Sequence, residues 1–141
     1  MGKIIDVCCA IIPEGHKIMA VQRGPESSHP YQWEFPGGKI QEGETPEEGI
    51  IREIEEELML KVVVVANLEP VKFDYGFGQV RLIPFVCRIA SGEIVLTEHI
   101  ALRWLEYAQL EMPEWSAADR ALIHKNQKSL KQLMFRADSY I

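Results

Sequence analysis

The sequence predicts an α/β sandwich in which a mixed β-sheet lies between helices, and three observations support this fold class. Apolar and β-branched segments of strand length recur along the chain, and two helical segments, starting at Pro46 and Ala117, are interleaved with them. The first strand segment, residues 4–12, is almost continuously apolar, which is typical of a strand covered on both faces. At 141 residues and 47% hydrophobic, the chain is expected to form one domain spanning residues 1–141.

The segments before the first helix predict a hairpin, a loop and a tight turn. Glu14-Gly15-His16 supplies a turn between the strand at residues 4–12 and a partner strand at residues 17–23. Residues 24–30 form a loop by composition. A brief alternating stretch at residues 33–36 then leads into a turn at Gly37-Gly38.

Beyond the first helix the chain returns to strands and closes with a second helix. Pro84 lacks an N–H donor, which directs its strand toward a sheet edge or a bulge. The expected elements are strands at residues 62–66, 72–75, 80–89, 94–97 and 102–105, a helical turn at 107–110, and a helix from Ala117 to about Arg136 with Ser116 as its N-cap.

Local rules define the start of the first helix. Thr45 suits the N-cap, Pro46 suits the first helical position, and Glu48 completes a capping box with Thr45. Carboxylates in the first turn are also favoured by the helix dipole. An apolar stripe, which can pack on a sheet, is formed by Ile50, Ile54 and Leu58.

The acidity of the chain is concentrated in this helix and the loop before it. Between Glu42 and Glu57 there are eight glutamates against one arginine, which gives −7, whereas the whole chain carries −6. Glu53, Glu56 and Glu57 share one face of the helix. One interpretation is a solvated acidic face. We favour a Mg²⁺ or Mn²⁺ site, because carboxylates and a carbonyl from the Gly-Gly turn are suitable oxygen ligands.

The polar positions of this stretch resemble the Nudix box, Gly-x5-Glu-x7-Arg-Glu-U-x-Glu-Glu-x-Gly-U, in which U is a bulky aliphatic residue. The fixed spacing of so many polar positions makes the match specific. One position departs, because Met59 stands where the box has glycine. The helix then either continues or ends on a residue at an unfavourable φ. The polar positions are filled by Gly38, Glu44, Arg52, Glu53, Glu56 and Glu57.

The resemblance implies a Nudix-type α/β/α sandwich, with the box as a loop-helix-loop, and hydrolysis of a nucleoside diphosphate linked to another moiety. A divalent cation would neutralise the pyrophosphate, align the attacking water and lower the pKa of that water. By carry-over the cofactor is Mg²⁺, with Mn²⁺ as an alternative, and its ligands are Glu56 and Glu57 together with Glu53, Glu98 and the Gly37 carbonyl.

The catalytic roles implied by the resemblance leave two alternatives open. Glu53 is either a ligand or the base that takes the proton of the water, and Arg52 is expected to orient Glu53 through its guanidinium fork. Glu44 would brace the loop. Glu98 is either a metal ligand or base, or an exposed loop residue without a role. The expected catalytic set is Arg52, Glu53, Glu56, Glu57 and Glu98.

Segments flanking the box resemble the MutT-type branch, nucleotide-pool sanitisers linked to DNA repair that cleave 8-oxo-dGTP to the monophosphate and pyrophosphate. These segments are WEFPGGKIQEGETPEE and Trp115-x-x-Ala118-Asp119. A CTP or modified-dCTP pyrophosphohydrolase fits nearly the same pattern, and a non-catalytic nucleotide-binding domain is a third reading. The implied substrate-binding residues are Arg23, Glu34, Phe35, Lys39 and Asp119.

Asp119 departs from the founding MutT pattern, which has asparagine at this position. An ionised aspartate only accepts hydrogen bonds, so it could read an amine or a ring N–H on either base. The alternative is that Asp119 forms a capping box with Ser116. Trp33 and Trp115 are candidates either for base stacking or for the core, and the four histidines show no ligand spacing.

Composition excludes several other functions. A net charge of −6 without a basic stripe argues against nucleic-acid binding. No apolar run approaches the ~20 residues that cross a bilayer, so no membrane contact is expected. The three cysteines lack CxxC spacing, which indicates buried thiols rather than disulfides or zinc ligands. We expect a cytoplasmic monomer whose partner is a nucleoside triphosphate.

Overall fold

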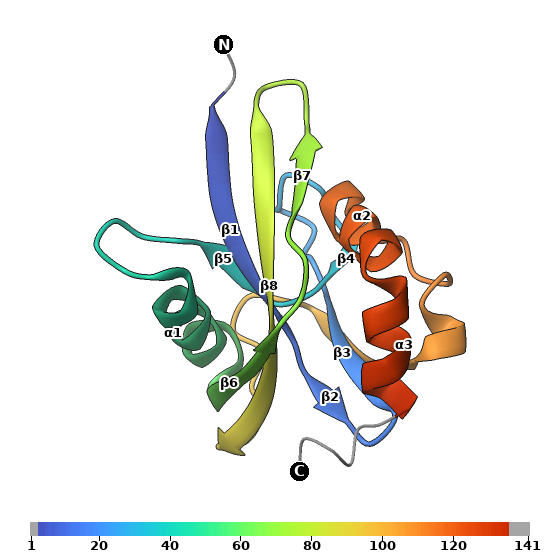
Figure 1. Cartoon of the computed structure of the whole chain (residues 1–141). Helices are drawn as coiled ribbons and strands as arrows, with labels where there is room; N and C mark the ends of the chain where they lie inside the picture. The colour runs from blue at the N-terminus through green and yellow to red at the C-terminus, as the bar shows by residue number, and fades with distance from the viewer. Residues whose placement is uncertain (1–2, 136–141) are drawn as a thin grey trace.

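The computed structural model describes residues 3–135 and places its strands between α1 on one side and the α2–α3 pair on the other (Figure 1). This is the predicted α/β/α arrangement. The helices are α1 (Pro46–Leu58), the 3-10 helix η1 (Tyr107–Gln109), α2 (Ala117–Lys125) and α3 (Gln127–Phe135). The strands are β1 (Ile4–Ile11), β2 (Pro13–Glu14), β3 (Lys17–Gln22), β4 (Trp33–Glu34), β5 (Gly37–Lys39), β6 (Lys61–Asn67), β7 (Val71–Asp74), β8 (Gln79–Ser91) and β9 (Ala101–Glu106).

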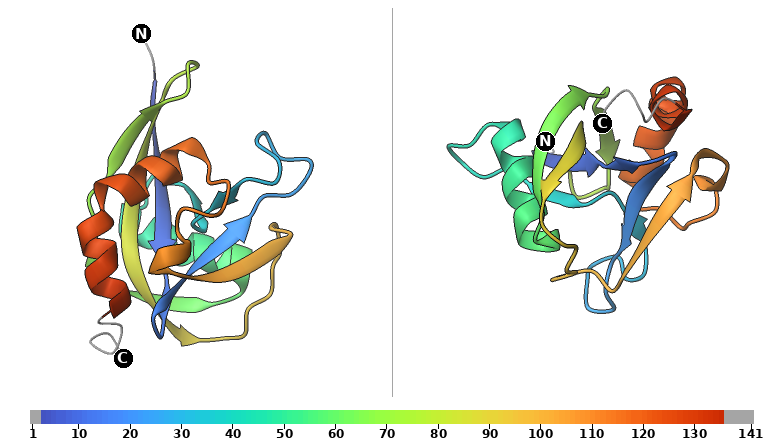
Figure 2. Two further views of the ribbon diagram at one scale, coloured as in Figure 1. Left: turned by 90° about the vertical axis from the view of Figure 1, so that its right-hand side faces the viewer. Right: turned by 90° about the horizontal axis from the view of Figure 1, so that it is seen from below.

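Two sheets form the central layer. The first has the order β5-β1-β8-β6, with β7 also pairing with β8, and it is mixed because β1 and β8 run parallel while its other pairs are antiparallel. The second sheet is antiparallel, with β3 between β9 and the short strands β2 and β4. Seen from below, α1 and the α2–α3 pair cover opposite sides of these strands (Figure 2).

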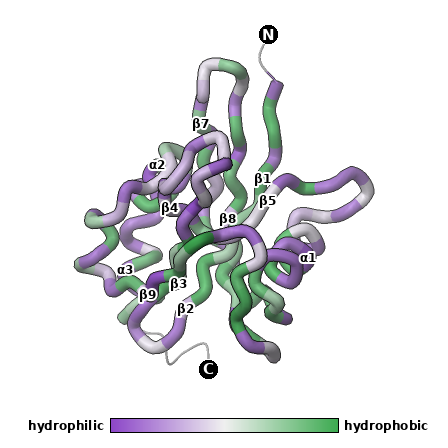
Figure 3. The backbone as a smooth tube through the Cα atoms, turned by 180° about the vertical axis from the view of Figure 1, so that it is seen from behind, coloured by the Kyte–Doolittle hydropathy of each residue, from purple (hydrophilic) through white to green (hydrophobic). Residues whose placement is uncertain are grey.

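The hydrophobic core lies on both sides of β1, as the continuous apolar sequence predicts. Cys9 and Ile11 belong to the cluster that packs against α2 and α3, whereas Cys8 and Ala10 belong to the cluster under α1. Figure 3 shows hydrophobic residues concentrated in the central strands and hydrophilic ones along the loop that enters α1. The three cysteines are free and buried, as expected. No helix within residues 3–135 has the length and hydropathy needed to cross a membrane.

Helix α1 begins as predicted. Thr45 is its N-cap, and the reciprocal bonds of a capping box join Thr45 and Glu48. The helix ends at Leu58, and Met59 adopts a left-handed conformation with φ of 59°. The second of the two expected outcomes for Met59 is therefore observed, and a methionine occupies the position where glycine is favoured.

Two expectations about turns and strands near α1 are wrong. Gly37 and Gly38 form strand β5 rather than a turn, because β5 pairs closely with β1; a Cβ on Gly37 would lie 2.0 Å from the carbonyl oxygen of Cys8. Residues 94–97 are not a strand. Val95 and Thr97 donate instead to the carbonyls of Leu58 and Glu57, which the end of α1 leaves without helical partners.

Pro84 lies in the central strand β8, so of the two expected alternatives, an edge or a bulge, the edge position is wrong. Residues 79–82 of β8 pair with β7 and residues 85–91 pair with β6. Pro84 falls between these two ranges, where the ladder requires no N–H donor from it. A register shift in β6, between Val64 and Ala66, accompanies the change of partner.

The predicted C-terminal helix is divided in two at Asn126. The Asn126 side chain is buried, accepts a hydrogen bond from the Glu69 N–H at 2.8 Å and donates to the Glu69 carbonyl at 2.9 Å. These tertiary bonds fix a non-helical residue, with ψ of 21°, between α2 and α3. The expected end near Arg136 lies outside the described residues.

Candidate functional site

Arg52 is the centre of an ion-pair network on α1. Its Nη2 lies 2.7 Å from Oε1 of Glu44 and its Nε lies 3.0 Å from Oε2 of the same side chain. The guanidinium fork thus pairs with Glu44 rather than with Glu53, which receives one contact from Nη1 at 3.0 Å. Glu44 braces the loop as expected, because it also accepts from the N–H of Gln41. Pairing with Arg52 lowers the pKa of Glu44 to about 2.

Glu57 is the buried carboxyl of the helix face, with an exposed fraction of 2%. Its Oε1 accepts from the Gly37 N–H at 3.3 Å, and its carboxyl interacts with that of Glu53. Burial raises the pKa of Glu57 to about 10, and the neighbouring carboxylates of Glu53, Glu98 and Glu34 contribute to that rise. Without a cation, this carboxyl is therefore favoured in its protonated form at neutral pH.

The donor set fits a divalent cation. All the groups are hard oxygen donors, and their mutual repulsion, expressed in the raised pKa of Glu57, is what a bound cation would relieve. Gly38 leaves room for this arrangement, since a Cβ there would lie 2.6 Å from the Glu53 carboxyl. Within residues 3–135, however, no three His, Cys, Asp or Glu side chains already adopt metal-binding geometry. Glu56 turns to Arg52 and is 56% exposed, so the ligand set, including the Gly37 carbonyl, stays a prediction.

Glu98 is exposed, but its backbone segment is fixed to the end of α1. The hydroxyl of Thr97 donates to the Glu56 carbonyl at 2.7 Å, and the Thr97 N–H donates to the Glu57 carbonyl at 3.1 Å. The charge of Glu98 contributes to the raised pKa of Glu57, which places the two carboxylates in electrostatic contact. Both expected readings of Glu98, as a metal ligand or base and as a loop residue without a role, stay predictions.

Opposite α1, Glu34 is held by two cationic or polar side chains. Its Oε1 lies 3.0 Å from Nη1 of Arg23, and its Oε2 lies 2.8 Å from Nε2 of His99. Sequence reasoning assigned no site role to His99, because it has no spacing typical of a ligand. Its one visible feature was its position directly after Glu98. The structure brings it beside Glu34 and Glu57.

Asp119 lies buried in the first turn of α2, where its Oδ1 accepts from the Phe35 N–H at 2.9 Å. The Ser116 hydroxyl donates to its Oδ2, so the two residues do not form the capping box considered as an alternative. Burial raises the pKa of Asp119 to about 7, with a further contribution from Glu34. Asp119 therefore joins α2 to the segment that follows β4.

The remaining predicted residues divide between surface and core. Lys39 is exposed on β5, and its carbonyl accepts from Nη2 of Arg52. Trp33 and Trp115 are 7% and 4% exposed, which favours the core role for both. The Trp115 ring packs on Phe35, with ring centroids 4.9 Å apart.

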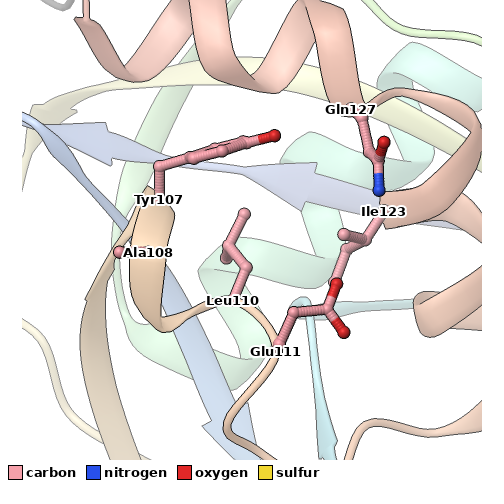
Figure 4. A pocket seen from close by; sticks show the side chains of 6 residues that line it. All are labelled: Tyr107, Ala108, Leu110, Glu111, Ile123 and Gln127. Carbon is pink, nitrogen blue, oxygen red and sulfur yellow. The ribbon is translucent and has the colours of Figure 1, made fainter.

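A cavity of about 190 Å³ lies between η1 and the α2–α3 pair (Figure 4). None of the predicted site residues lines it, and its one carboxylate is that of Glu111. It is therefore separate from the carboxyl cluster on α1. Its lining residues are Tyr107, Ala108, Leu110, Glu111, Ile123 and Gln127.

Comparisons with known proteins show what this chain is similar to. Residues 2–125 match the model of the NUDIX domain. An 8-oxo-dGTP diphosphatase of Haemophilus influenzae is 32% identical over 124 residues, which are 87% of this chain and 91% of that protein. A CTP pyrophosphohydrolase of Escherichia coli is 30% identical over 102 residues, 72% of this chain and 76% of that protein. The solution structure of the DNA mismatch repair protein MutT from methicillin-resistant Staphylococcus aureus 252 is similar at a TM-score of 0.73 and 36% identity, over 92% of this chain and 99% of that chain.

Proposed function

Since this chain belongs to the Nudix family and is a hydrolase of phosphoanhydride bonds, we propose that it is a Mg²⁺-dependent nucleoside triphosphate pyrophosphohydrolase acting on 8-oxo-dGTP. Water adds across the anhydride between the α- and β-phosphates, and the products are the nucleoside monophosphate and pyrophosphate. The observation that carries the proposal is the Glu53–Glu57 carboxyl pair, in which burial and like charge call for a cation.

The proposal gives each half of the site a task. Nudix hydrolases use divalent ions, which neutralise phosphate charge and activate water. Glu53, Glu56 and Glu57 would hold the ion, with Glu98 and the Gly37 carbonyl completing the set. Arg52 keeps Glu53 and Glu56 beside each other through its Nη1. Where Glu53 is not a ligand, it takes the proton of the attacking water.

The nucleotide would bind across Arg23, Glu34, Phe35 and Asp119, with Lys39 near its phosphates. A base reader must present unoccupied hydrogen-bonding capacity. Each oxygen of Asp119 accepts one protein bond, which leaves further acceptor capacity for a base N–H. In this proposal the protein is a single-domain, cytoplasmic monomer that removes oxidised nucleotides before they enter DNA.

A CTP or modified-dCTP pyrophosphohydrolase is the second candidate. It is favoured by the similarity to the E. coli CTP pyrophosphohydrolase.

The test is a panel of triphosphates, including 8-oxo-dGTP, dGTP, CTP and 5-methyl-dCTP, assayed with Mg²⁺. We expect release of pyrophosphate and the largest kcat/KM for 8-oxo-dGTP, and chelation of the metal should abolish turnover. A larger kcat/KM for CTP would select the second candidate. Phosphate as the sole phosphorus product, or no turnover with any triphosphate, would contradict both.

A further inference from the structure

His99 lies between the two halves of the site. Its Nε2 is 2.8 Å from Oε2 of Glu34, which belongs to β4 of the second sheet. Its Nδ1 is 3.9 Å from Oε1 of Glu57, which belongs to α1 on the face of the first sheet. Nε2 of this buried imidazole thus faces Glu34, which belongs to the proposed nucleotide-binding residues (the nucleotide side). Nδ1 faces Glu57, which belongs to the proposed metal ligands (the metal side).

The backbone on both sides of His99 is anchored. Thr97 is bound to the last turn of α1 through its hydroxyl and its N–H, as described above. The Ile100 N–H donates to the Gln22 carbonyl at 3.0 Å, which continues the pairing of β9 with β3. The segment of four residues, 97–100, is therefore bound to α1 at one end and to β3 at the other. This leaves the imidazole little freedom to leave its position between them.

The imidazole is satisfied on one side only. Nδ1 is buried and has no hydrogen-bond partner among residues 3–135, while Nε2 is paired with Glu34. A buried polar nitrogen without a partner is costly, and such atoms call for an explanation. Oε1 of Glu57 lies 3.9 Å from this nitrogen, beyond direct hydrogen-bonding distance.

We propose that His99 is a positioning residue that couples Glu34 on the nucleotide side to Glu57 on the metal side. This inference rests on the proposed function, since it assigns both carboxylates to one active site. Through Glu34, His99 is also connected to Arg23, whose Nη1 contacts the other oxygen of that carboxylate. The hydrogen bonds that orient metal-ligating groups typically change metal affinity or activity by about 10–100-fold when they are removed.

The experiment separates the two nitrogens with His99→Gln and His99→Asn. The longer amide of Gln can replace Nε2 at Glu34, so we expect KM within about threefold of wild type and kcat reduced about tenfold. The shorter amide of Asn lies nearer the Nδ1 position. We therefore expect kcat within about threefold of wild type and KM raised about tenfold. His124→Gln is the matched control, because His124 is half-exposed and lies 3.7 Å from the exposed Glu111.

A second measurement requires no turnover. Titration of Mn²⁺ by electron paramagnetic resonance should show an affinity about tenfold lower in His99→Ala than in wild type. Unchanged Mn²⁺ affinity would overturn the inference. It would also be overturned if kcat fell and KM rose together in both the Gln and the Asn variant, with a lowered melting temperature. Either result would leave the proposed function standing. Wild-type protein that binds Mn²⁺ but hydrolyses no triphosphate would overturn the proposed function, and the Mn²⁺ affinities would still decide the role of His99.

Discussion

The two halves of the site are built in different ways. The acidic helix face consists of Glu44, Arg52, Glu53, Glu56 and Glu57, all from one loop and helix. The assembled wall consists of Arg23, Glu34, His99 and Asp119, which come from distant parts of the chain. Sixty-five residues separate the partners of the Glu34–His99 bond, and 84 separate Phe35 from Asp119.

The halves also differ in how their charges are satisfied. On the acidic helix face, the Arg52 guanidinium forms ion pairs with three carboxylates. Glu57 is buried and has no Lys or Arg partner among residues 3–135. On the assembled wall, each carboxylate has at least two polar partners, supplied by Arg23, His99, Ser116 and the Phe35 N–H. The carboxylates of the assembled wall are therefore paired as folded, whereas Glu57 of the acidic helix face is the carboxyl that a cation would stabilise. The wall still holds two buried nitrogens, Nε of Arg23 and Nδ1 of His99, that have no hydrogen-bond partner within residues 3–135.

The largest effect that tests this contrast is expected from Glu57→Gln. The amide has the shape of the protonated carboxyl and removes a candidate metal ligand, so kcat should fall about 10³-fold, in the range of a lost catalytic electrostatic contact. Because burial already favours the protonated form of Glu57, the melting temperature of the metal-free variant should equal or exceed that of wild type. Steady-state kinetics and circular dichroism measure both quantities.

The matched control is Glu55→Gln, which removes an exposed carboxylate from the same helix. It should change kcat by less than about twofold, because substitutions of exposed side chains away from a site have small effects. If Glu57→Gln unfolded the protein while keeping the turnover of the folded fraction, Glu57 would belong to the structure rather than to the reaction, and the contrast between the halves would fail.

A smaller loss is expected from Arg52→Lys. Lysine keeps the charge but cannot present Nε and Nη2 to both oxygens of Glu44, so the loop and the neighbouring carboxylates should lose their fixed positions. We expect kcat to fall by about 10–100-fold with little change in KM. Arg88→Lys, at an exposed arginine of β8, is the control. A change confined to KM would instead place Arg52 on the substrate.

The same contrast explains what the sequence could predict. The N-cap, the capping box, the apolar stripe and the acidic helix face depend on spacings of three or four residues, so local rules reached them. The partner of the Arg52 fork was misassigned because Glu44 and Glu53 both lie within reach, and helical spacing does not distinguish a loop carboxylate from a helical one. The order of strand and helix segments indicated the α/β sandwich, and the family resemblance added its Nudix type and the reaction class.

Tertiary contacts decided what local rules could not. His99 was missed because its two neighbours are brought to it by separate elements. Asn126 interrupts a helix of good local propensity because Glu69, in the loop between β6 and β7, binds its side chain. Pro84 fits a central strand because β6 and β7 meet opposite it. In each of these cases the deciding partner is at least ten residues away, beyond the three- or four-residue spacings that local rules use.

The remaining effect concerns stability rather than turnover, through the pH dependence of the assembled wall. Burial raises the pKa of Asp119 from 3.8 to about 7 in the folded chain. Between these values the unfolded chain releases this proton while the folded chain retains it, so Asp119 lowers stability as pH rises through that window. This loss of stability is complete above about pH 7. The rise of the pKa from 3.8 to about 7 corresponds to roughly 4 kcal/mol as an upper limit.

Asp119→Asn should remove this dependence while keeping the contact with the Phe35 N–H, because the amide oxygen still accepts. The Ser116 hydroxyl can rotate from donor to acceptor and pair with the amide nitrogen. We therefore expect the variant to gain stability relative to wild type as the pH is raised from 4 to 8, in urea unfolding followed by circular dichroism. If the two stability curves stay parallel across this range, Asp119 is ionised in the folded chain at acidic pH, and the assembled wall holds its charges as well as its hydrogen bonds.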